Sequence, residues 1–172
     1  MQINRDFAYA NFTNTIHMNK KQLFLSIEKR LNESTLSKHQ ALDVADGLFL
    51  LMQTDDELEK KQLNVLQSKF LDILNRSGIL DLVQSQMNYA IKIADAPGEL
   101  LYEEMHKLFS LCDTIYALEN LGSNSDNHLK ESYEKSIKKR FMTEKKKAKM
   151  VAEDKFEDRK NDFWWYKEAL SF

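Results

Sequence analysis

The sequence predicts an all-α protein, chiefly because it is poor in the residues that make turns. The 172 residues include four glycines and one proline, whereas a sheet needs a turn about every 8–12 residues and turns depend on such residues. Leu, Lys, Glu, Gln, Met and Ala, which favour helix, are abundant instead. The hydrophobic content of 42% is enough for a core. Apolar periodicity then indicates a bundle of about five helices, followed by a long C-terminal helical segment.

The first confident helix is expected to begin near Asn19 and to end in the polar stretch 32–35. Its apolar residues share one face at helical spacing: Leu23, Phe24, Ile27 and Leu31. Residues 1–18 are rich in Asn and Thr, which compete for backbone hydrogen bonds. We therefore expect only a short helix or an ordered arm in residues 1–18.

A capping box opens the second helix, with Ser37 at the cap and Gln40 three residues later. The helix that follows is apolar on most sides around Leu48 and Phe49. A helix without a broad polar face must be surrounded by other elements, so this helix is expected to be central to the core.

Three further helices follow at similar spacing. A second capping box, Thr54 to Glu57, opens the third, and Gly78 is a natural C-terminal stop for it. The fourth is expected over 79–94, and the proline and glycine at 97 and 98 end it. The fifth continues to about Leu121.

The clearest linker is the Gly-Ser-Asn-Ser stretch 122–125. We therefore expect a helical bundle domain over residues 1–122 and a charged helical extension over residues 123–172. The five apolar faces before the linker look complete, so residues 19–121 are expected to fold without the extension.

The extension contains no glycine or proline from Asp126 onwards. As one unbroken helix it would be roughly 65–70 Å long. Most of its apolar residues fall on one half of such a helix. Met142, Met150 and Trp164 fall on the other side. These three residues are therefore exposed, covered by a partner, or evidence of a bend.

Charge is unevenly distributed along the chain. Residues 126–172 carry 13 basic and 10 acidic side chains, whereas residues 1–125 carry 12 and 17. The basic excess forms a run that is a candidate phosphate-binding surface: Lys138, Lys139, Arg140, Lys145, Lys146, Lys147 and Lys149. A solvated helix face explains such a run as well, and no signature of a known nucleic-acid-binding motif accompanies it.

Four consecutive aromatic residues near the C-terminus are the candidate partner-binding site: Phe163, Trp164, Trp165 and Tyr166. They can instead pack into the core, or lie at a membrane surface, although nearby acidic residues argue against an anionic membrane. The helical phase turns Trp165 towards the apolar stripe and Trp164 away from it. Trp165 is therefore expected to stabilise the fold and Trp164 to remain available to a partner.

The sequence carries no recognisable catalytic motif. One Glu-x-x-His, from Glu103 to His106, has the spacing used in di-iron bundles, but no second copy accompanies it. Cys112, the one cysteine, lies in an apolar helical pattern and is interpreted as a buried core thiol. We therefore predict no enzymatic activity, no metal site and no cofactor.

The leading hypothesis is a non-enzymatic helical interaction subunit: an accessory subunit, adaptor, chaperone or protein inhibitor. Its C-terminal helix would bind a protein partner or a second copy of the chain. The alternative is a helical nucleic-acid-binding protein that uses the run from Lys135 to Lys149. Residues 1–6 lack a signal-peptide pattern and the longest apolar run, 47–52, is too short for a bilayer. A cytoplasmic protein is therefore expected, and a membrane is not an expected partner.

Overall fold

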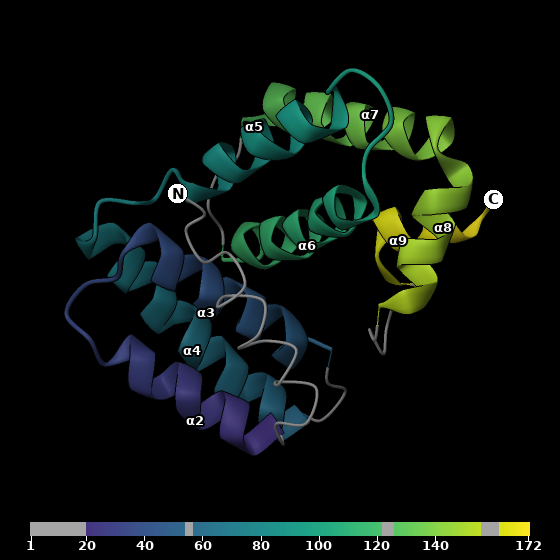
Figure 1. The fold of residues 1–172 in the computed structure, drawn as a ribbon. Coiled ribbons are helices and arrows are strands. Elements are labelled where there is room, and N and C mark those ends of the chain that lie inside the picture. Colours follow the sequence, from purple (N-terminus) through teal and green to yellow (C-terminus); the bar gives the residue numbers. More distant parts are fainter. Residues whose placement is uncertain (1–19, 54–56, 122–125, 156–161) are drawn as a thin grey trace, which may run out of the picture. The chain divides into compact units, whose positions relative to one another are not determined.

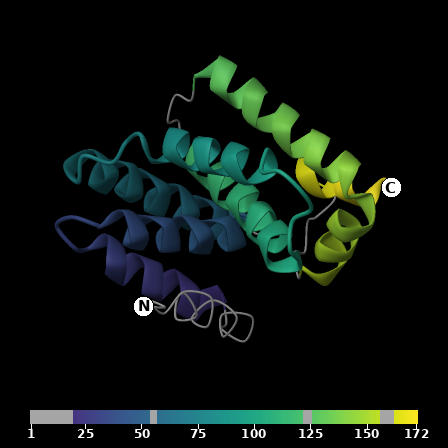
Figure 2. The same cartoon turned by 45° about the horizontal axis from the view of Figure 1, so that its top comes forward.

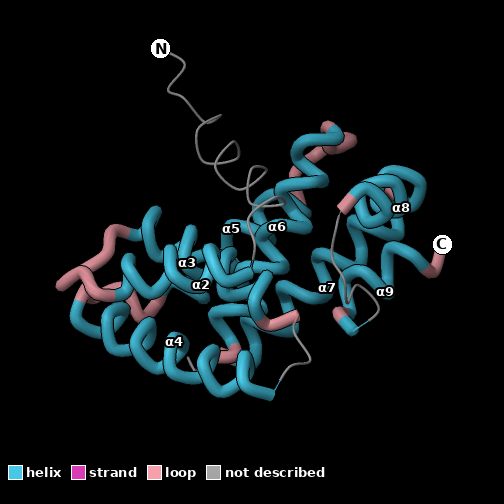
Figure 3. The backbone as a smooth tube through the Cα atoms, turned by 90° about the horizontal axis from the view of Figure 1, so that it is seen from below, coloured by secondary structure: helices cyan, strands magenta, loops and turns pink. Residues whose placement is uncertain are grey.

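The computed structural model describes residues 20–53, 57–121, 126–155 and 162–172. Every regular element in these ranges is a helix, which confirms the all-α prediction (Figures 1 and 3). No helix in these ranges combines the length and the apolar character that a bilayer crossing requires. The chain divides into two compact units, residues 1–79 and residues 80–172, called here the N-terminal unit and the C-terminal unit.

The described residues of the N-terminal unit form three helices that pack against one another. They are α2 (Lys20–Leu31), α3 (Lys38–Leu51) and α4 (Glu57–Arg76). These are the first three helices that the sequence predicts, with bounds that differ by few residues. The predicted arm of residues 1–18, and the start of the second predicted capping box at residue 54, lie outside the described residues.

Local signals set the helix ends in this unit. The Ser37 side chain accepts from the Gln40 backbone N–H (3.2 Å), and Gln40 Oε1 accepts from the Ser37 N–H (2.9 Å), so the predicted capping box is present. Gly78 ends α4 with a φ of 68°, a left-handed conformation that favours glycine. The Ile79 N–H then donates to the Leu74 carbonyl oxygen (3.1 Å), which completes a Schellman motif.

The helix predicted to be central is buried as expected. Leu48 is 0% exposed and Phe49 is 2% exposed. A Cβ atom built on Gly47 would lie 2.8 Å from Ile27 Cδ1, so the Ile27 side chain of α2 occupies the space that a larger residue on α3 would need. The absence of a Cβ at Gly47 therefore supports the packing of these two helices.

The C-terminal unit contains the remaining described helices. They are α5 (Leu82–Ala94), α6 (Tyr102–Glu119), α7 (Asn127–Thr143), α8 (Lys145–Asp154) and α9 (Trp164–Leu170). α5 packs against both α6 and α7, α8 packs against α6, and α9 packs against α7 and α8. In Figure 2, the C-terminal end of α7 (green) lies next to the short helices at the yellow-green end of the chain.

The predicted long C-terminal segment is helical but is not one helix. It breaks at Glu144, whose φ of −121° and ψ of 46° are not helical, and again after Asp154. The Glu144 carboxylate accepts from the Leu100 backbone N–H (3.0 Å), from Arg140 Nη1 (2.9 Å) and from Lys147 Nζ (2.7 Å). The contact with the distant Leu100, together with the two local ones, fixes the bend, and α8 packs against α6.

The predicted linker at residues 122–125 lies outside the described residues, and the compact units are divided elsewhere. The compact units meet at residues 79 and 80, not at the linker after residue 121. The reason is visible around Phe109 of α6, whose ring stacks on Phe141 of α7 (4.7 Å between centroids) and lies 5.4 Å from Tyr166 of α9. α6 therefore belongs with the helices on both sides of that linker.

Candidate functional site

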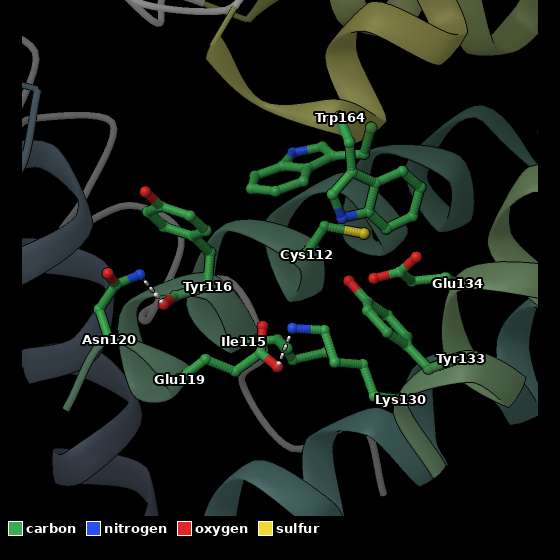
Figure 4. Close-up of a pocket in the computed structure, with 10 residues that line it drawn as sticks. Cys112, Ile115, Tyr116, Glu119, Asn120, Lys130, Tyr133, Glu134 and Trp164 are labelled. Carbon is green, nitrogen blue, oxygen red and sulfur yellow. Dashed lines mark hydrogen bonds and ion pairs between the residues drawn. The ribbon is translucent and has the colours of Figure 1, made fainter. Parts of the chain in front are cut away.

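A pocket of about 310 Å³ opens in the C-terminal unit where α6, α7 and α9 meet (Figure 4). Each helix supplies at least two of the side chains that shape it: Tyr116 and Glu119 from α6, Tyr133 and Glu134 from α7, Trp164 and Trp165 from α9. This volume is at the lower end of the range for ligand sites, about 300–1,000 Å³, and suits a single side chain or a small ligand.

Helical spacing explains why these residues face one space. Cys112, Tyr116 and Glu119 are separated by four and three residues, so they lie along one face of α6. Lys130 and Glu134 have the same relation on α7. In Figure 4 the labelled side chains of α6 and α7 converge from opposite sides, with Trp164 above them.

Four aromatic rings form one wall of the pocket. The Tyr116 ring lies 5.7 Å from Trp165, and the two indoles lie 5.8 Å apart at 82°. The Trp164 ring in turn lies 6.1 Å from Tyr133 at 77°. Near-perpendicular rings expose π-faces in several directions, and edge-to-face pairs of this kind are favourable contacts in themselves.

The pocket is also lined by two carboxylates with lysine partners. Glu119 pairs with Lys130 (3.0 Å), and Glu134 with Lys138 (3.9 Å). The carboxylate side chains are 20% and 31% exposed, whereas the lysines are 42% and 47% exposed. The negative groups therefore lie deeper than their positive partners. Lys138 Nζ also lies 5.2 Å from the Trp164 ring centroid, a cation–π contact.

Cys112 and Tyr133 close the pocket's inner end and are fully or almost fully buried. Burial raises the pKa of both groups well above their ordinary values; the hydrogen bond between them adds to the rise at Tyr133 and opposes it at Cys112. A thiol held protonated is a poor nucleophile. The sequence interpretation of Cys112 as a buried core thiol is confirmed.

A buried polar cluster anchors α9 beside the pocket. Trp165 Nε1 donates to Asp113 Oδ1 (2.9 Å), and the Tyr166 hydroxyl lies 3.4 Å from Asp113 Oδ2. Lys155 Nζ forms an ion pair with the same carboxylate at 2.9 Å, and both side chains are less than 10% exposed. The sequence analysis did not single out Asp113. The sequence feature that could have identified Asp113 is its position as an acidic residue within the most continuous apolar stretch of α6.

The four predicted partner-binding residues are divided by the structure. Phe163, Trp165 and Tyr166 are buried, at 5%, 1% and 0% exposure, whereas Trp164 is partly exposed. Trp165 is buried and Trp164 is half-buried, but the breaks at Glu144 and after Asp154 remove the continuous helical phase on which the expectation for these two residues was based. Three members of the aromatic cluster are thus core residues, and Trp164 is the member that other molecules can reach.

The predicted basic run is divided as well. Arg140 is buried, and its guanidinium donates to the carbonyl oxygens of Ala94 (2.6 Å), Gly98 (2.7 Å) and Ala96. Lys147 donates to the Leu100 carbonyl oxygen and to Glu144. Both side chains tie the connection between α5 and α6 to the bend between α7 and α8.

Three more members of the run contact neighbouring groups. Lys145 Nζ lies 5.2 Å from the Phe172 ring, Lys149 Nζ donates to the Phe172 main-chain oxygen (3.0 Å), and Lys138 lies over Trp164. Of the seven residues in the run, Lys139 and Lys146 are the two whose ammonium groups have no side-chain interaction within the part of the chain that the structure describes. The seven residues therefore do not form one surface of unengaged cations.

His106, from the Glu-x-x-His spacing, lies on α6 near the Asp113–Lys155 pair. Burial and the neighbouring Lys155 charge lower its pKa, against opposing effects of Asp113 and Asp154. No group of three or more His, Cys, Asp or Glu side chains among the described residues is placed to hold a metal ion. The Glu103–His106 pair thus has no further ligands gathered around it in those ranges.

Neither family models nor comparisons with curated proteins and solved structures give a match to this chain.

Proposed function

We propose that this chain is a non-enzymatic helical interaction subunit that binds a protein partner through Trp164 and the pocket beneath it. An accessory subunit, an adaptor, a chaperone and a protein inhibitor all fit this description. The observation that carries the proposal is the unequal use of two adjacent tryptophans: Trp165 is buried and hydrogen-bonded, whereas Trp164 stays partly exposed at the rim of a pocket.

Physical chemistry supports a binding role for such a residue. Tryptophan is among the side chains that contribute most to interface energies, and contributing residues cluster where a pocket can be desolvated. An exposed indole has a cost in solubility, which a binding role offsets. The aromatic wall with its charged rim resembles the usual arrangement of an apolar interface centre and a polar edge.

The engagement of the basic run favours this proposal over nucleic-acid binding. Phosphate recognition depends on cations that can release counterions, and five of the seven basic residues already contact groups of the fold. Salt separates the two ideas, because phosphate-driven binding weakens steeply between about 50 and 200 mM salt while burial of an indole does not.

The test is affinity capture from the native host with the whole chain as bait, using wild type, Trp164→Ala and Met150→Ala. Met150 is a matched control because it is a large exposed side chain of the same unit, on α8. Trp164→Ala should weaken binding of a specific protein by about 2 kcal/mol, a magnitude typical of interface hot spots, with little change in thermal stability.

Purified candidate partners then allow the same variants to be compared by calorimetry, and sedimentation of the bait alone detects self-association. Equal binding of the three baits would remove the support for Trp164 as the binding residue. Loss of binding that tracks loss of folded protein would show that Trp164 is an ordinary core residue.

A further inference from the structure

The pocket under Trp164 combines the two features that attract a cation: π-faces and carboxylates. Trp164, Trp165 and Tyr116 form a continuous aromatic wall, with neighbouring ring centroids 5.7–5.8 Å apart. Glu119 and Glu134 lie on the facing helices and line the same pocket. An aromatic face attracts a cation through its quadrupole, and a carboxylate nearby adds a direct charge interaction.

The fold already places cations at this site. Lys138 lies over the Trp164 ring and pairs with Glu134, and Lys130 pairs with Glu119. Both lysines are more exposed than the carboxylates that they neutralise. Lys130 is held by one surface ion pair, and Lys138 by a long ion pair and an exposed cation–π contact; interactions of this kind contribute little free energy, so both ammonium groups are easily displaced.

From this arrangement we infer that the pocket binds the guanidinium group of an arginine side chain on the partner protein. The inference rests on the proposed function and names the partner chemistry that the site recognises. A guanidinium is planar, stacks on an indole and presents a fork of donors to a carboxylate, whereas an ammonium is a compact and strongly hydrated charge. Arginine therefore displaces Lys138 and Lys130 from groups that the two lysines engage only at the rim.

The size of the pocket is consistent with this occupant. A volume of about 310 Å³ accommodates one long side chain. The inner end is closed by Cys112 and Tyr133, both buried, so only the end of a side chain enters. Since the resident lysines already neutralise the carboxylates, most of the gain comes from stacking on Trp164, and a modest intrinsic affinity is expected.

The test follows the indole N–H signals by ¹H–¹⁵N NMR, because the chain has two tryptophans and both line the pocket. The probes are N-acetyl-arginine methylamide and, as its neutral analogue of similar shape, N-acetyl-citrulline methylamide. The arginine probe should produce a saturable shift of the Trp164 signal at concentrations on the order of 10 mM. The citrulline probe should bind about 2- to 30-fold more weakly, the range that cation–π energies imply.

Three variants sharpen the outcome. Glu134→Gln keeps the shape of the side chain and should weaken the arginine probe. Lys130→Met removes the ion pair between Lys130 and Glu119. It should raise the affinity for the arginine probe by up to about fivefold, which corresponds to the free energy of one surface ion pair. Trp164→Ala should abolish the saturable shift of the remaining Trp165 signal, while the rest of the spectrum shows that the unit is still folded.

Equal binding of the arginine and citrulline probes, or no saturable shift with either, overturns the inference. So does weaker arginine binding in Lys130→Met, because it would mean that Lys130 supports the site and does not compete for it. These results are separate from the capture experiment. A partner whose binding depends on Trp164, in a chain that does not distinguish the two probes, leaves the proposed function standing and removes only the arginine assignment.

Discussion

Replacement of Asp113 by asparagine tests whether a buried carboxylate holds α9 in place. Asparagine keeps an oxygen that can accept from Trp165 Nε1, now 2.9 Å from Asp113 Oδ1, but it removes the charge opposite Lys155 Nζ at 2.9 Å. The Lys155 side chain is 9% exposed, so water does not replace the lost partner. The variant therefore isolates the charge from the shape of the cluster.

The size of the effect follows from the burial. A hydrogen bond to a charged group contributes about 1.5–3 kcal/mol, and Asp113→Asn should lower the free energy of unfolding by that amount. Asp113→Ala also leaves the Trp165 and Tyr166 donors without their acceptor, so it should cost about 3–5 kcal/mol, as for other broken buried pairs. A domain of this size is stable by only about 5–15 kcal/mol, so the alanine variant is expected to be close to unfolding.

Tryptophan fluorescence during urea unfolding reports on the C-terminal unit, because both tryptophans lie in that unit. Asp81→Asn is the matched control, because Asp81 is an exposed residue at the start of α5 whose side chain makes no capping hydrogen bond. It should change stability by less than about 0.5 kcal/mol.

A double-mutant cycle with Lys155→Met completes the test. If the pair acts as a unit, Asp113→Asn costs little more once Lys155 has been removed, and the coupling energy is about 1.5–3 kcal/mol. Strict additivity of the two substitutions, or a cost for Asp113→Asn no larger than for Asp81→Asn, would refute the reasoning.

Three other predictions address pH, folding units and the N-terminal core. The pKa of His106 is lower in the folded chain, so the unfolded chain binds the proton first as pH falls. The free energy of unfolding should therefore decline from about pH 6.5 through the pKa of the folded state. His106→Gln should remove this slope in thermal melts recorded at several pH values. A fragment of residues 80–172 should melt cooperatively when followed by circular dichroism. A fragment of residues 1–122 should lose the structure around Phe109, because it lacks Phe141 and Tyr166, which cover that ring. A cooperative melt of all helices in residues 1–122 would contradict this. Phe49→Ala should cost about 3–5 kcal/mol in chemical denaturation, and a loss below about 1 kcal/mol would show that α3 is not central.

The features that the sequence predicts correctly are set by neighbouring residues. The capping box at Ser37, the stop at Gly78 and the burial of Leu48 all follow from spacings of a few residues. The apolar face of the C-terminal segment was predicted for the same reason, and Ile137 and Val151 are fully buried on it. Apolar periodicity predicts which face of a helix is buried, whatever the position of that helix in the fold.

The bend at Glu144 has no comparable local signal. Neither Thr143, Glu144 nor Lys145 prevents a helix, and no glycine or proline marks the break. The conformation is fixed by the Leu100 N–H, which donates to a carboxylate 44 residues later in the chain. Hydrogen bonds from Lys147, Leu100 and Arg140 outweigh the effect of burial and hold the Glu144 pKa below its ordinary value. A contact of this range cannot be inferred from one segment.

A similar limit applies to the linker predicted at residues 122–125. A Gly-Ser-Asn-Ser stretch shows that the chain leaves a helix there, but it does not show whether the flanking helices touch. The pocket could not be predicted from the sequence for the same reason. Periodicity places Tyr116 and Tyr133 on the inward faces of their helices, but their convergence with Trp164 depends on the approach of α6, α7 and α9.

Substitution of Trp164 is expected to affect partner binding alone, whereas substitution of Trp165 is expected to affect both stability and binding. α9 has seven residues, too few for a helix to be stable by itself, so it depends on the anchorage of Trp165 to Asp113. Trp165→Phe removes the indole donor and should loosen α9, which displaces Trp164 from the pocket as well. Trp164→Ala leaves the anchor in place and should affect binding alone. Consequently, a Trp165 variant that loses stability but keeps full partner binding would show that Trp164 can bind the partner without the anchor of Trp165 to Asp113.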